Sequence, residues 1–256
     1  MSETRSGTDP MAAEFDDLPG WTADAAARLG TAHAVPAACR GSASPAALDW
    51  LSRRCALRAG AVLVDVGGGM GGPAAHAREQ YAVRPLVVEP MSGACRAARR
   101  MFGLPTVVGT GSALPVPSGA ADAVWCLGVL CTTTAKAAVL GEIRRVLAPG
   151  GVAGLLVFTV DGPIDGVPEG NAFPTRDELD RLLTAARLVT AGSTPLAELP
   201  PPPREWTERI TRVEQLVEAE HGRDEAWRVA QQQEGRLADL LRSGQVSGTL
   251  LAVRPV

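Results

Sequence analysis

The sequence predicts an α/β fold in which a mostly parallel sheet carries helices on both faces. The stretch AVLVDVGGGMGGPA at residues 61–74 reads as a buried apolar strand, a glycine turn and the start of a helix. Further apolar strands alternate with helical segments along the chain, as in folds whose parallel strands are joined by helices. An acid, Glu89, ends the second strand 22 residues after Gly67, which is the spacing of nucleoside-binding α/β folds.

Local signals predict the individual elements. Seven strands are expected, over residues 61–66, 86–89, 106–108, 122–127, 152–159, 188–190 and 246–256. Ser44 followed by Pro45 predicts a helix start, and Thr175 with Glu178 predicts a capping box at another. Further helices are predicted after the glycine turn and over residues 92–102, 134–147, 206–217 and 224–242.

The glycine turn predicts a ligand site, because glycines lack the Cβ atoms that keep a ligand from the backbone and the new helix offers free N–H groups. Gly67, Gly69 and Gly72 satisfy the dinucleotide pattern GxGxxG, and the same letters contain D-x-G-x-G-x-G from Asp65 to Gly71. A carboxylate here would repel a pyrophosphate but attract the ammonium group of an amino-acid ligand, by about 4 kcal/mol at an effective dielectric constant of 20. We favour the amino-acid ligand; the alternative is an Asp65 that only caps the turn.

Glu89 is placed to accept hydrogen bonds from the hydroxyl groups of a ribose, because it ends the strand next to the glycine turn. Met91 follows two residues later and would lie beside an adenine ring as a polarizable apolar contact. Ordinary loop packing is the alternative for this methionine. Asp65 and Glu89 together predict a nucleoside that carries an amino-acid tail.

Three motifs resemble those of class I S-adenosylmethionine-dependent methyltransferases, particularly the small-molecule branch related to the ubiquinone and menaquinone methylases (type 11). They are the strand and glycine turn at 61–74, the run GTGSALPVPSGAADAV at 109–124, and E-x-x-R-V-L-x-P-G-G at 142–151. The resemblance covers about residues 61–160. It implies a Rossmann-like fold, S-adenosyl-L-methionine as cofactor and S-adenosyl-L-homocysteine as product.

The same resemblance implies further cofactor contacts. Family members commonly have an acid that binds the adenine amino group where this chain has Thr110, and the next backbone N–H, here that of Gly111, meets the ring. A hydroxyl makes a weaker hydrogen bond than a carboxylate, and Ser112 can share this contact. Leu127, at the tip of the fourth strand, is expected to face the methyl-bearing sulfur. Relatives often have histidine just beyond that strand, where this chain has Cys131.

Four parts are expected along the chain, one of which is the core. Residues 1–43 are an N-terminal tail, disordered over residues 1–10, followed by a helical lid, and residues 44–199 are the cofactor-binding core. Residues 200–244 are a helical insertion, and residues 245–256 are the final core strand. The N-terminal helices either close over the ligand or only cover a sheet edge. We favour a substrate wall over a simple sheet cover for the insertion, because the minimal fold does not need its helices.

Candidate substrate contacts come from these helical segments and from the edge of the sheet: Trp21, His33, Cys131, Trp206 and His221. His33 and His221 are also the candidates for a general base, although the sequence shows no evident His–Asp or His–Glu constellation. The catalytic residues are otherwise unassigned. For Cys131, a small buried hydrophobic side chain is the favoured alternative.

Composition restricts the classes of partner. The 256 residues carry a formal net charge of −3 and the isoelectric point is near 5.7, which disfavours nucleic acid and favours a small-molecule substrate. Five cysteines without a CxxC pair indicate neither a disulfide framework nor a metal site. The sequence shows no signal core or membrane-spanning run, so we expect a cytoplasmic protein without a membrane partner. Monomer and homodimer both stay open.

The resulting prediction is methyl transfer from S-adenosylmethionine to a small molecule, such as a natural product or other secondary metabolite, at O, N or C. The reaction would proceed by in-line positioning of the acceptor. One alternative is a nicotinamide-dependent dehydrogenase, for which Asp65 would be incidental. Another is a non-methylating protein that retains the methyltransferase core as a binding or rearrangement scaffold.

Overall fold

The computed structural model describes residues 10–39 and 43–256. The tail predicted to be disordered, residues 1–10, lies outside the described residues except for Pro10, which begins helix α1. Within the described residues, no helix is both long enough and apolar enough to cross a membrane.

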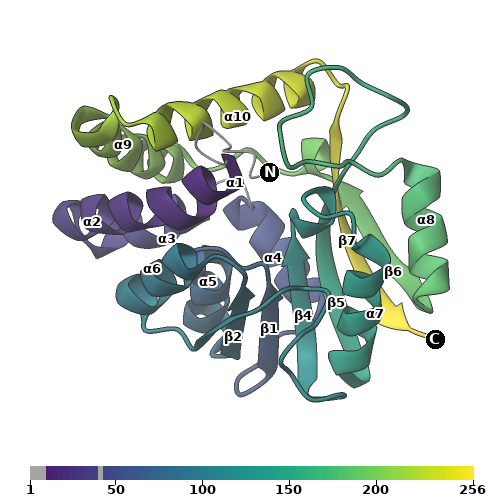
Figure 1. The fold of residues 1–256 in the computed structure, drawn as a ribbon. Helices are drawn as coiled ribbons and strands as arrows, with labels where there is room; N and C mark the ends of the chain where they lie inside the picture. The colour runs from purple at the N-terminus through teal and green to yellow at the C-terminus, as the bar shows by residue number, and fades with distance from the viewer. Residues whose placement is uncertain (1–9, 40–42) are drawn as a thin grey trace, which may run out of the picture.

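Seven strands form one sheet in the order β3-β2-β1-β4-β5-β7-β6 (Figure 1). Strands β1 to β5 pair in parallel, and β7 runs antiparallel to both β5 and β6. Their bounds are β1 Val62–Val66, β2 Arg84–Glu89, β3 Thr106–Val108, β4 Ala121–Leu127, β5 Leu147–Thr159, β6 Leu188–Pro195 and β7 Ser247–Pro255. This arrangement confirms the predicted Rossmann-like α/β fold with a mostly parallel seven-stranded sheet.

The helices begin where the capping signals predict. Ser44 Oγ accepts a hydrogen bond from the Ala47 amide at 3.3 Å, and Thr175 Oγ1 accepts one from the Glu178 amide at 3.1 Å. The α-helices are α1 Pro10–Ala12, α2 Leu18–Leu29, α3 Ala34–Ala38, α4 Pro45–Arg54, α5 Gly72–Tyr81, α6 Ser92–Phe102, α7 Lys136–Val146, α8 Arg176–Ala185, α9 Arg204–His221 and α10 Glu225–Arg242. Four short segments are a π-helix, η1 Ala13–Asp17, and the 3-10 helices η2 Thr31–His33, η3 Val129–Cys131 and η4 Leu196–Glu198.

Helices cover the two faces of the sheet separately. Successive strand residues point to opposite faces, so Val64 and Val124 pack under α7 and α8, whereas Leu63 and Trp125 pack under α4 and α5. All four side chains are fully buried, and each contributes roughly 1.5–3 kcal/mol of hydrophobic stabilisation. The sheet therefore has an apolar core on both sides.

The remaining helices form a cap over the carboxyl ends of the parallel strands (Figure 1). We use "cap" for residues 10–38 together with α9 and α10. These segments share one apolar cluster, to which Leu18, Ala26, Ala37, Val213 and Trp227 contribute. Two parts of the chain that are far apart in sequence thus build a single cap. Its role as a lid and substrate wall stays a prediction.

Candidate functional site

The chain turns through a glycine loop between β1 and α5. Gly67, Gly69 and Gly71 have φ values of 64°, 54° and 76°, in the left-handed region that residues with a Cβ rarely adopt. Gly67 also lacks room for a side chain, because a Cβ there would collide with Cγ2 of Val129. The loop backbone therefore lies directly against η3, the segment that follows β4, and leads into the N-terminus of α5.

Asp65 lies beneath this loop. Its side chain is buried, and its Oδ2 has no hydrogen-bond partner among the described residues. A Cβ at Gly68 would stand 2.8 Å from that oxygen, so only a glycine allows the loop this close. Burial, and after it the charge of Glu89, raises the pKa of Asp65 to about 7. A buried carboxylate oxygen without a partner is costly, and a cationic ligand would compensate it.

Glu89 connects the glycine loop to the end of β2. Its Oε2 accepts a hydrogen bond from the Gly69 amide at 3.0 Å, and its Oε1 accepts one from the Met91 amide at 2.9 Å. Burial raises the pKa of Glu89, and these two amide hydrogen bonds oppose the rise. Each carboxylate oxygen can accept a further hydrogen bond. The structure thus brings Asp65, Gly69, Glu89 and Met91 together at one edge of the sheet, as expected from their spacing.

The segment after β3 carries the residues predicted to meet adenine. Thr110 Oγ1 and Ser112 Oγ lie 3.2 Å apart, so one hydroxyl donates to the other. Gly111 approaches β1 closely, because a Cβ there would stand 2.9 Å from Cγ1 of Val66. This segment therefore follows the carboxyl end of β1 and presents neutral hydroxyls at its surface.

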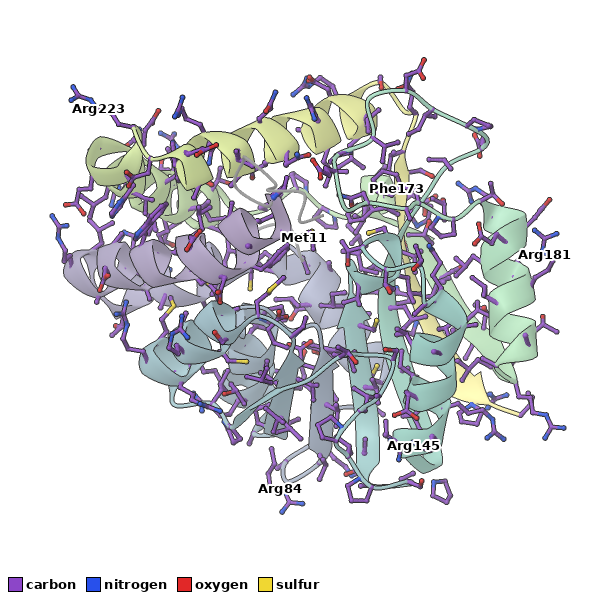
Figure 2. All side chains as sticks on the ribbon, viewed as in Figure 1. Met11, Arg84, Arg145, Phe173, Arg181 and Arg223 are labelled. Carbon is purple, nitrogen blue, oxygen red and sulfur yellow. The ribbon has the colours of Figure 1, made fainter. Side chains whose placement is uncertain are left out.

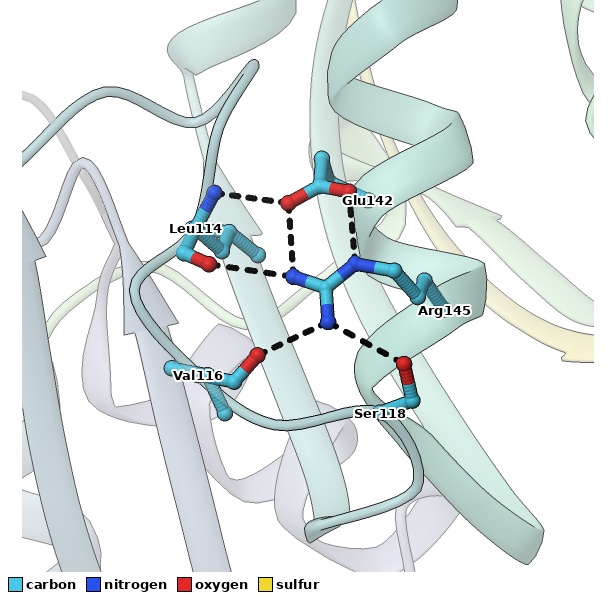
Figure 3. A network of polar contacts seen from close by, with 5 residues as sticks. All are labelled: Leu114, Val116, Ser118, Glu142 and Arg145. Carbon is cyan, nitrogen blue, oxygen red and sulfur yellow. Dashed lines mark hydrogen bonds and ion pairs between the residues drawn. The ribbon is translucent and has the colours of Figure 1, made fainter.

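A network around Arg145 fixes the rest of that segment (Figure 3). Nε and Nη2 of Arg145 donate to the two oxygens of Glu142, each at 2.7 Å, and Glu142 also accepts from the Leu114 amide at 2.7 Å. Arg145 further donates to the carbonyls of Leu114 and Val116, at 3.0 and 2.8 Å, and to Ser118 Oγ at 3.3 Å. The arginine holds the pKa of Glu142 below its usual range. Two residues of the E-x-x-R-V-L motif therefore stabilise the segment that follows Thr110–Ser112.

The end of β4 is apolar. Leu127 is buried there, and Gly128, at a φ of 79°, turns the chain into η3. Sγ of Cys131 donates to the Gly128 carbonyl at 2.7 Å, and burial raises the pKa of this thiol to about 12. The Ala172 amide donates to the Cys131 carbonyl at 2.6 Å, which brings the loop after β5 over the strand end. Trp206 packs in the same apolar cluster as Leu127 and Cys131.

Two of the predicted substrate residues, Trp21 and His221, contact each other in the cap and not at the end of β4. Trp21 and His221 stack with ring centroids 4.1 Å apart and an interplanar angle of 7°. Nδ1 of His221 also lies 2.8 Å from Oδ2 of Asp224. Both ring nitrogens of His33 are buried, without a hydrogen-bond partner in the described part of the chain. The structure therefore brings Trp21 and His221 to each other, and Trp21 belongs to the cap cluster rather than to the cluster at β4.

Two glycines that the sequence analysis did not single out for this role allow the cap to dock. Asp16 of η1 accepts hydrogen bonds from the Gly93 amide and, at 3.4 Å, from the Ser92 hydroxyl at the start of α6. A Cβ at Gly93 would collide with the Asp16 carbonyl, and one at Gly72 would collide with the backbone of Ala38. The available signal was a glycine in the first turn of α5 and of α6. The cap segments that these glycines contact are too far away in the sequence to be identified from this signal.

The site has two buried carboxylates at one end and an apolar strand end at the other. It can therefore compensate a positive charge at Asp65 and Glu89 and exclude water near Leu127. In residues 10–39 and 43–256, no group of three or more His, Cys, Asp or Glu side chains is placed to hold a metal ion.

Comparison with known proteins gives a family match for this region. A family model described as "Methyltransferase domain" matches residues 64–155. These residues contain the glycine loop, Glu89, the Thr110–Ser112 segment and the Glu142–Arg145 network. The match confirms the family resemblance of the sequence.

One curated relative is 24-methylenesterol C-methyltransferase 2 of Oryza sativa subsp. japonica. It is 29% identical over 170 residues, which make up 58% of this chain and 46% of the rice protein. The chain thus spans about half the length of the curated relative that it matches.

Solved structures share the fold at low sequence identity. The cyclase SpnF superposes with a TM-score of 0.64 and 21% identity, covering 82% of this chain and 80% of SpnF. Geranyl diphosphate C-methyltransferase from Streptomyces coelicolor A3(2) superposes with a TM-score of 0.61 and 18% identity, covering 82% and 78% of the two chains. These similarities place the sheet and its helices within the fold of both proteins.

Proposed function

Because a methyltransferase family model matches residues 64–155, we propose that this chain binds S-adenosyl-L-methionine and transfers its methyl group to a small molecule, releasing S-adenosyl-L-homocysteine. The observation that carries the proposal is the buried Oδ2 of Asp65, which has no hydrogen-bond partner in the described residues and lies beneath the glycine loop. Asp65 and Glu89 are both buried at one sheet edge. This arrangement favours a ligand with positive charge, such as the ammonium and sulfonium groups of this cofactor.

Each part of the edge has its own role in this proposal. Asp65 binds the amino group of the cofactor. Glu89 accepts hydrogen bonds from the ribose hydroxyls with the lone pairs that its two backbone amides leave free. Thr110 and Ser112 bind the adenine edge together with the Gly111 amide, and the Glu142–Arg145 network stabilises the following turn.

The chain's contribution to the reaction is positioning. The bound cofactor supplies an activated methyl group on its sulfur. The chain's own residues would position the acceptor atom against this methyl group, and such positioning is worth roughly 7–11 kcal/mol. Leu127 lies where the fourth strand ends, and the buried Cys131 and the partly buried Phe173 share its apolar cluster. An apolar environment of this kind excludes water from the reacting atoms.

Contacts between the cap and the loop after β5 enclose the same end of the sheet. A Cβ at Gly170, in the loop after β5, would stand 2.9 Å from Sδ of Met11, and the neighbouring Glu169 amide donates to Gln233 of α10 at 3.0 Å. Figure 2 shows Met11 and Phe173 between α10 and the upper ends of the strands. These contacts support the proposal that the cap acts as lid and substrate wall.

We propose a carbon acceptor in an apolar molecule of natural-product type. Cys131 stands where the family resemblance often implies a histidine, and with a pKa of about 12 it keeps its proton near neutral pH. An acceptor that need not lose a proton before attack, such as an amine or an activated carbon, is then favoured. The C-methyltransferases among the similar proteins, which are named for a sterol and for geranyl diphosphate, support carbon.

A second candidate function is a scaffold that binds the cofactor without methylating. The similarity in fold to a protein described as a cyclase supports it.

We also propose a reducing, cytoplasmic setting and a small-molecule rather than a nucleic-acid substrate. All five cysteines are free and buried, as expected of thiols in a reducing compartment. The formal net charge of −3 offers little attraction for a polyanion.

The proposal is tested by incubating the full chain with methyl-labelled S-adenosylmethionine and a panel of apolar alkenes, amines and phenols. We expect label on at least one acceptor and stoichiometric release of S-adenosylhomocysteine, both lost in Asp65→Asn. Cofactor binding without transfer to any acceptor would support the scaffold. Protection from thermal unfolding by NAD but not by S-adenosylhomocysteine would contradict both and favour a dehydrogenase.

A further inference from the structure

Lys136 is a buried cation at the first position of α7. Its side chain is 7% exposed, and its Nζ donates a hydrogen bond to the Thr133 carbonyl at 2.8 Å. Within the described ranges, no carboxylate forms an ion pair with it. A lysine is rarely buried without such a partner, and the helix dipole opposes a cation at a helix N-terminus. Folding stability therefore does not explain this residue.

Lys136 is also the only lysine of the chain. Lysine and arginine together number 25, so arginine fills every other basic position. A guanidinium is planar and broad, whereas an ammonium is a compact point charge with three donors that can turn. The single lysine of the chain is thus also the one lysine or arginine that is buried among residues 10–39 and 43–256.

Lys136 lies on the side of α7 that packs against the sheet. Val139, Leu140 and Ile143 are buried against the sheet, and Lys136 precedes them by three, four and seven residues. It therefore continues their stripe by one turn, beyond the point where the strand ends. Side chains on a helix also tilt towards its N-terminus, which carries the ammonium further in that direction.

Through Cys131, this ammonium lies next to the apolar cluster at the end of β4. Cys131 lies close enough for the charge of Lys136 to act on its thiol, although burial dominates the raised pKa. Cys131 shares a cluster with Leu127, Phe173 and Trp206. One positive charge thus borders the apolar environment in which we place the acceptor.

We propose that Lys136 binds an anionic group of the methyl acceptor, a carboxylate or a phosphate, so that the acceptor is an apolar molecule with one anionic group. The inference rests on the proposed function and specifies its substrate class. Thr133 uses one of the three ammonium donors, and the other two are available for charge-assisted hydrogen bonds. Such an anchor fixes one end of an apolar chain at a set distance from the end of β4.

Because the chain has a single lysine, protein labelled with 13Cε-lysine gives one side-chain Cε resonance, that of Lys136. We would titrate the full chain, saturated with S-adenosylhomocysteine, with decanoate, decyl phosphate and decan-1-ol. Calorimetry on Lys136→Met and Lys136→Arg would give affinities for the same probes. The two anions distinguish a carboxylate from a phosphate, and the alcohol is the neutral control.

We expect the Lys136 resonance to shift saturably with at least one anion and not with the alcohol. Lys136→Met should weaken that anion's binding at least tenfold, Lys136→Arg should weaken it less, and both should bind S-adenosylhomocysteine as the wild type does. Anion binding that is unchanged in Lys136→Met, equal binding of the alcohol, or no anion binding to the loaded wild type would overturn the inference. Failure of S-adenosylhomocysteine to bind the wild type would instead overturn the proposed function.

Discussion

Glu89 and Gly69 are joined by a hydrogen bond of 3.0 Å between Oε2 and the backbone amide. The bond connects the end of β2 to the glycine loop after β1, and the second oxygen of Glu89 accepts from Met91 in the same way. The edge that we propose as the cofactor site is therefore assembled by the protein's own contacts. Pre-assembly of this kind lowers the cost of ordering the site when a ligand binds.

Glu89→Gln should weaken S-adenosylhomocysteine binding at least tenfold, or about 1.4 kcal/mol. The glutamine NH2 would face a backbone N–H, because both oxygens of Glu89 accept from amides. Isothermal titration calorimetry measures the change. Glu79→Gln, at an exposed position on α5, is the control and should bind as the wild type does. Equal affinity of Glu89→Gln and wild type would show that Glu89 does not bind the ligand.

Asp65→Asn should stabilise the ligand-free protein above pH 7. The folded pKa of about 7 exceeds the ordinary 3.8, so the stability that Asp65 contributes is present at low pH and lost as the pH rises towards and through 7. Denaturant unfolding of variant and wild type at several pH values gives the difference in the free energy of unfolding. That difference should shrink as the pH falls towards 4. A variant less stable than wild type at pH 8 would argue against an uncompensated carboxylate.

Cofactor affinity should rise with pH and level off above about pH 7, because an ammonium group needs ionised Asp65 as its partner. Below that pH the affinity for S-adenosylhomocysteine should change by up to about tenfold per pH unit. Calorimetry in buffers of different ionisation enthalpy counts the protons released on binding. In Asp65→Asn this proton release should disappear. An affinity independent of pH in the wild type would contradict the assignment.

Arg145→Met should lower the free energy of unfolding by about 1–3 kcal/mol, because it leaves the carbonyls of Leu114 and Val116 without their donor. The loosened segment follows Thr110–Ser112, so S-adenosylhomocysteine affinity should fall as well. Thermal unfolding and calorimetry measure the two effects. Arg144→Met is the neighbouring control, since its Nε has no partner among the described residues. Equal effects of Arg145→Met and Arg144→Met would show that the Arg145 network does not stabilise the segment that follows Thr110–Ser112.

Gly93→Ala should displace the cap from α6, because its Cβ would collide with the Asp16 carbonyl. We expect faster hydrogen exchange in α1 to α3 and weaker cofactor binding. Gly141→Ala, in α7, is the matched control because no atom lies within 4 Å of its added Cβ. Unchanged exchange in the cap of Gly93→Ala would mean that Asp16 does not hold it in place.

Local sequence patterns predicted the core well because each strand and loop of the core carries its own signal. The ranges of α6 and β3 agree with the prediction at residues 92–102 and 106–108, and the end of β2 at Glu89 follows from its apolar run. β5 begins at Leu147 rather than at 152, because Ala121 pairs with Leu147 ahead of a register shift in the ladder. The Pro-Gly-Gly sequence in this stretch is typical of a turn, so strand pairing was not expected there.

Contacts between distant segments could not be predicted in this way. Asp16 and Gly93 are 77 residues apart, and the Trp21–His221 stack joins the two halves of the cap. The burial of Lys136 was also missed, since a lysine ahead of an apolar stripe resembles an exposed helix end. These features depend on how helices from both ends of the chain pack over the sheet, and a single sequence carries no record of that packing.

The central claim is that Asp65 is the acid that binds the amino group of S-adenosylmethionine. Calorimetric titration of S-adenosylmethionine into wild type and Asp65→Ala at pH 8 tests it most directly. The account predicts one-to-one binding by the wild type and at least tenfold weaker binding, about 1.4 kcal/mol, by the variant. Equal affinity in the two proteins, or wild-type protein that binds NAD in place of S-adenosylmethionine, would contradict it.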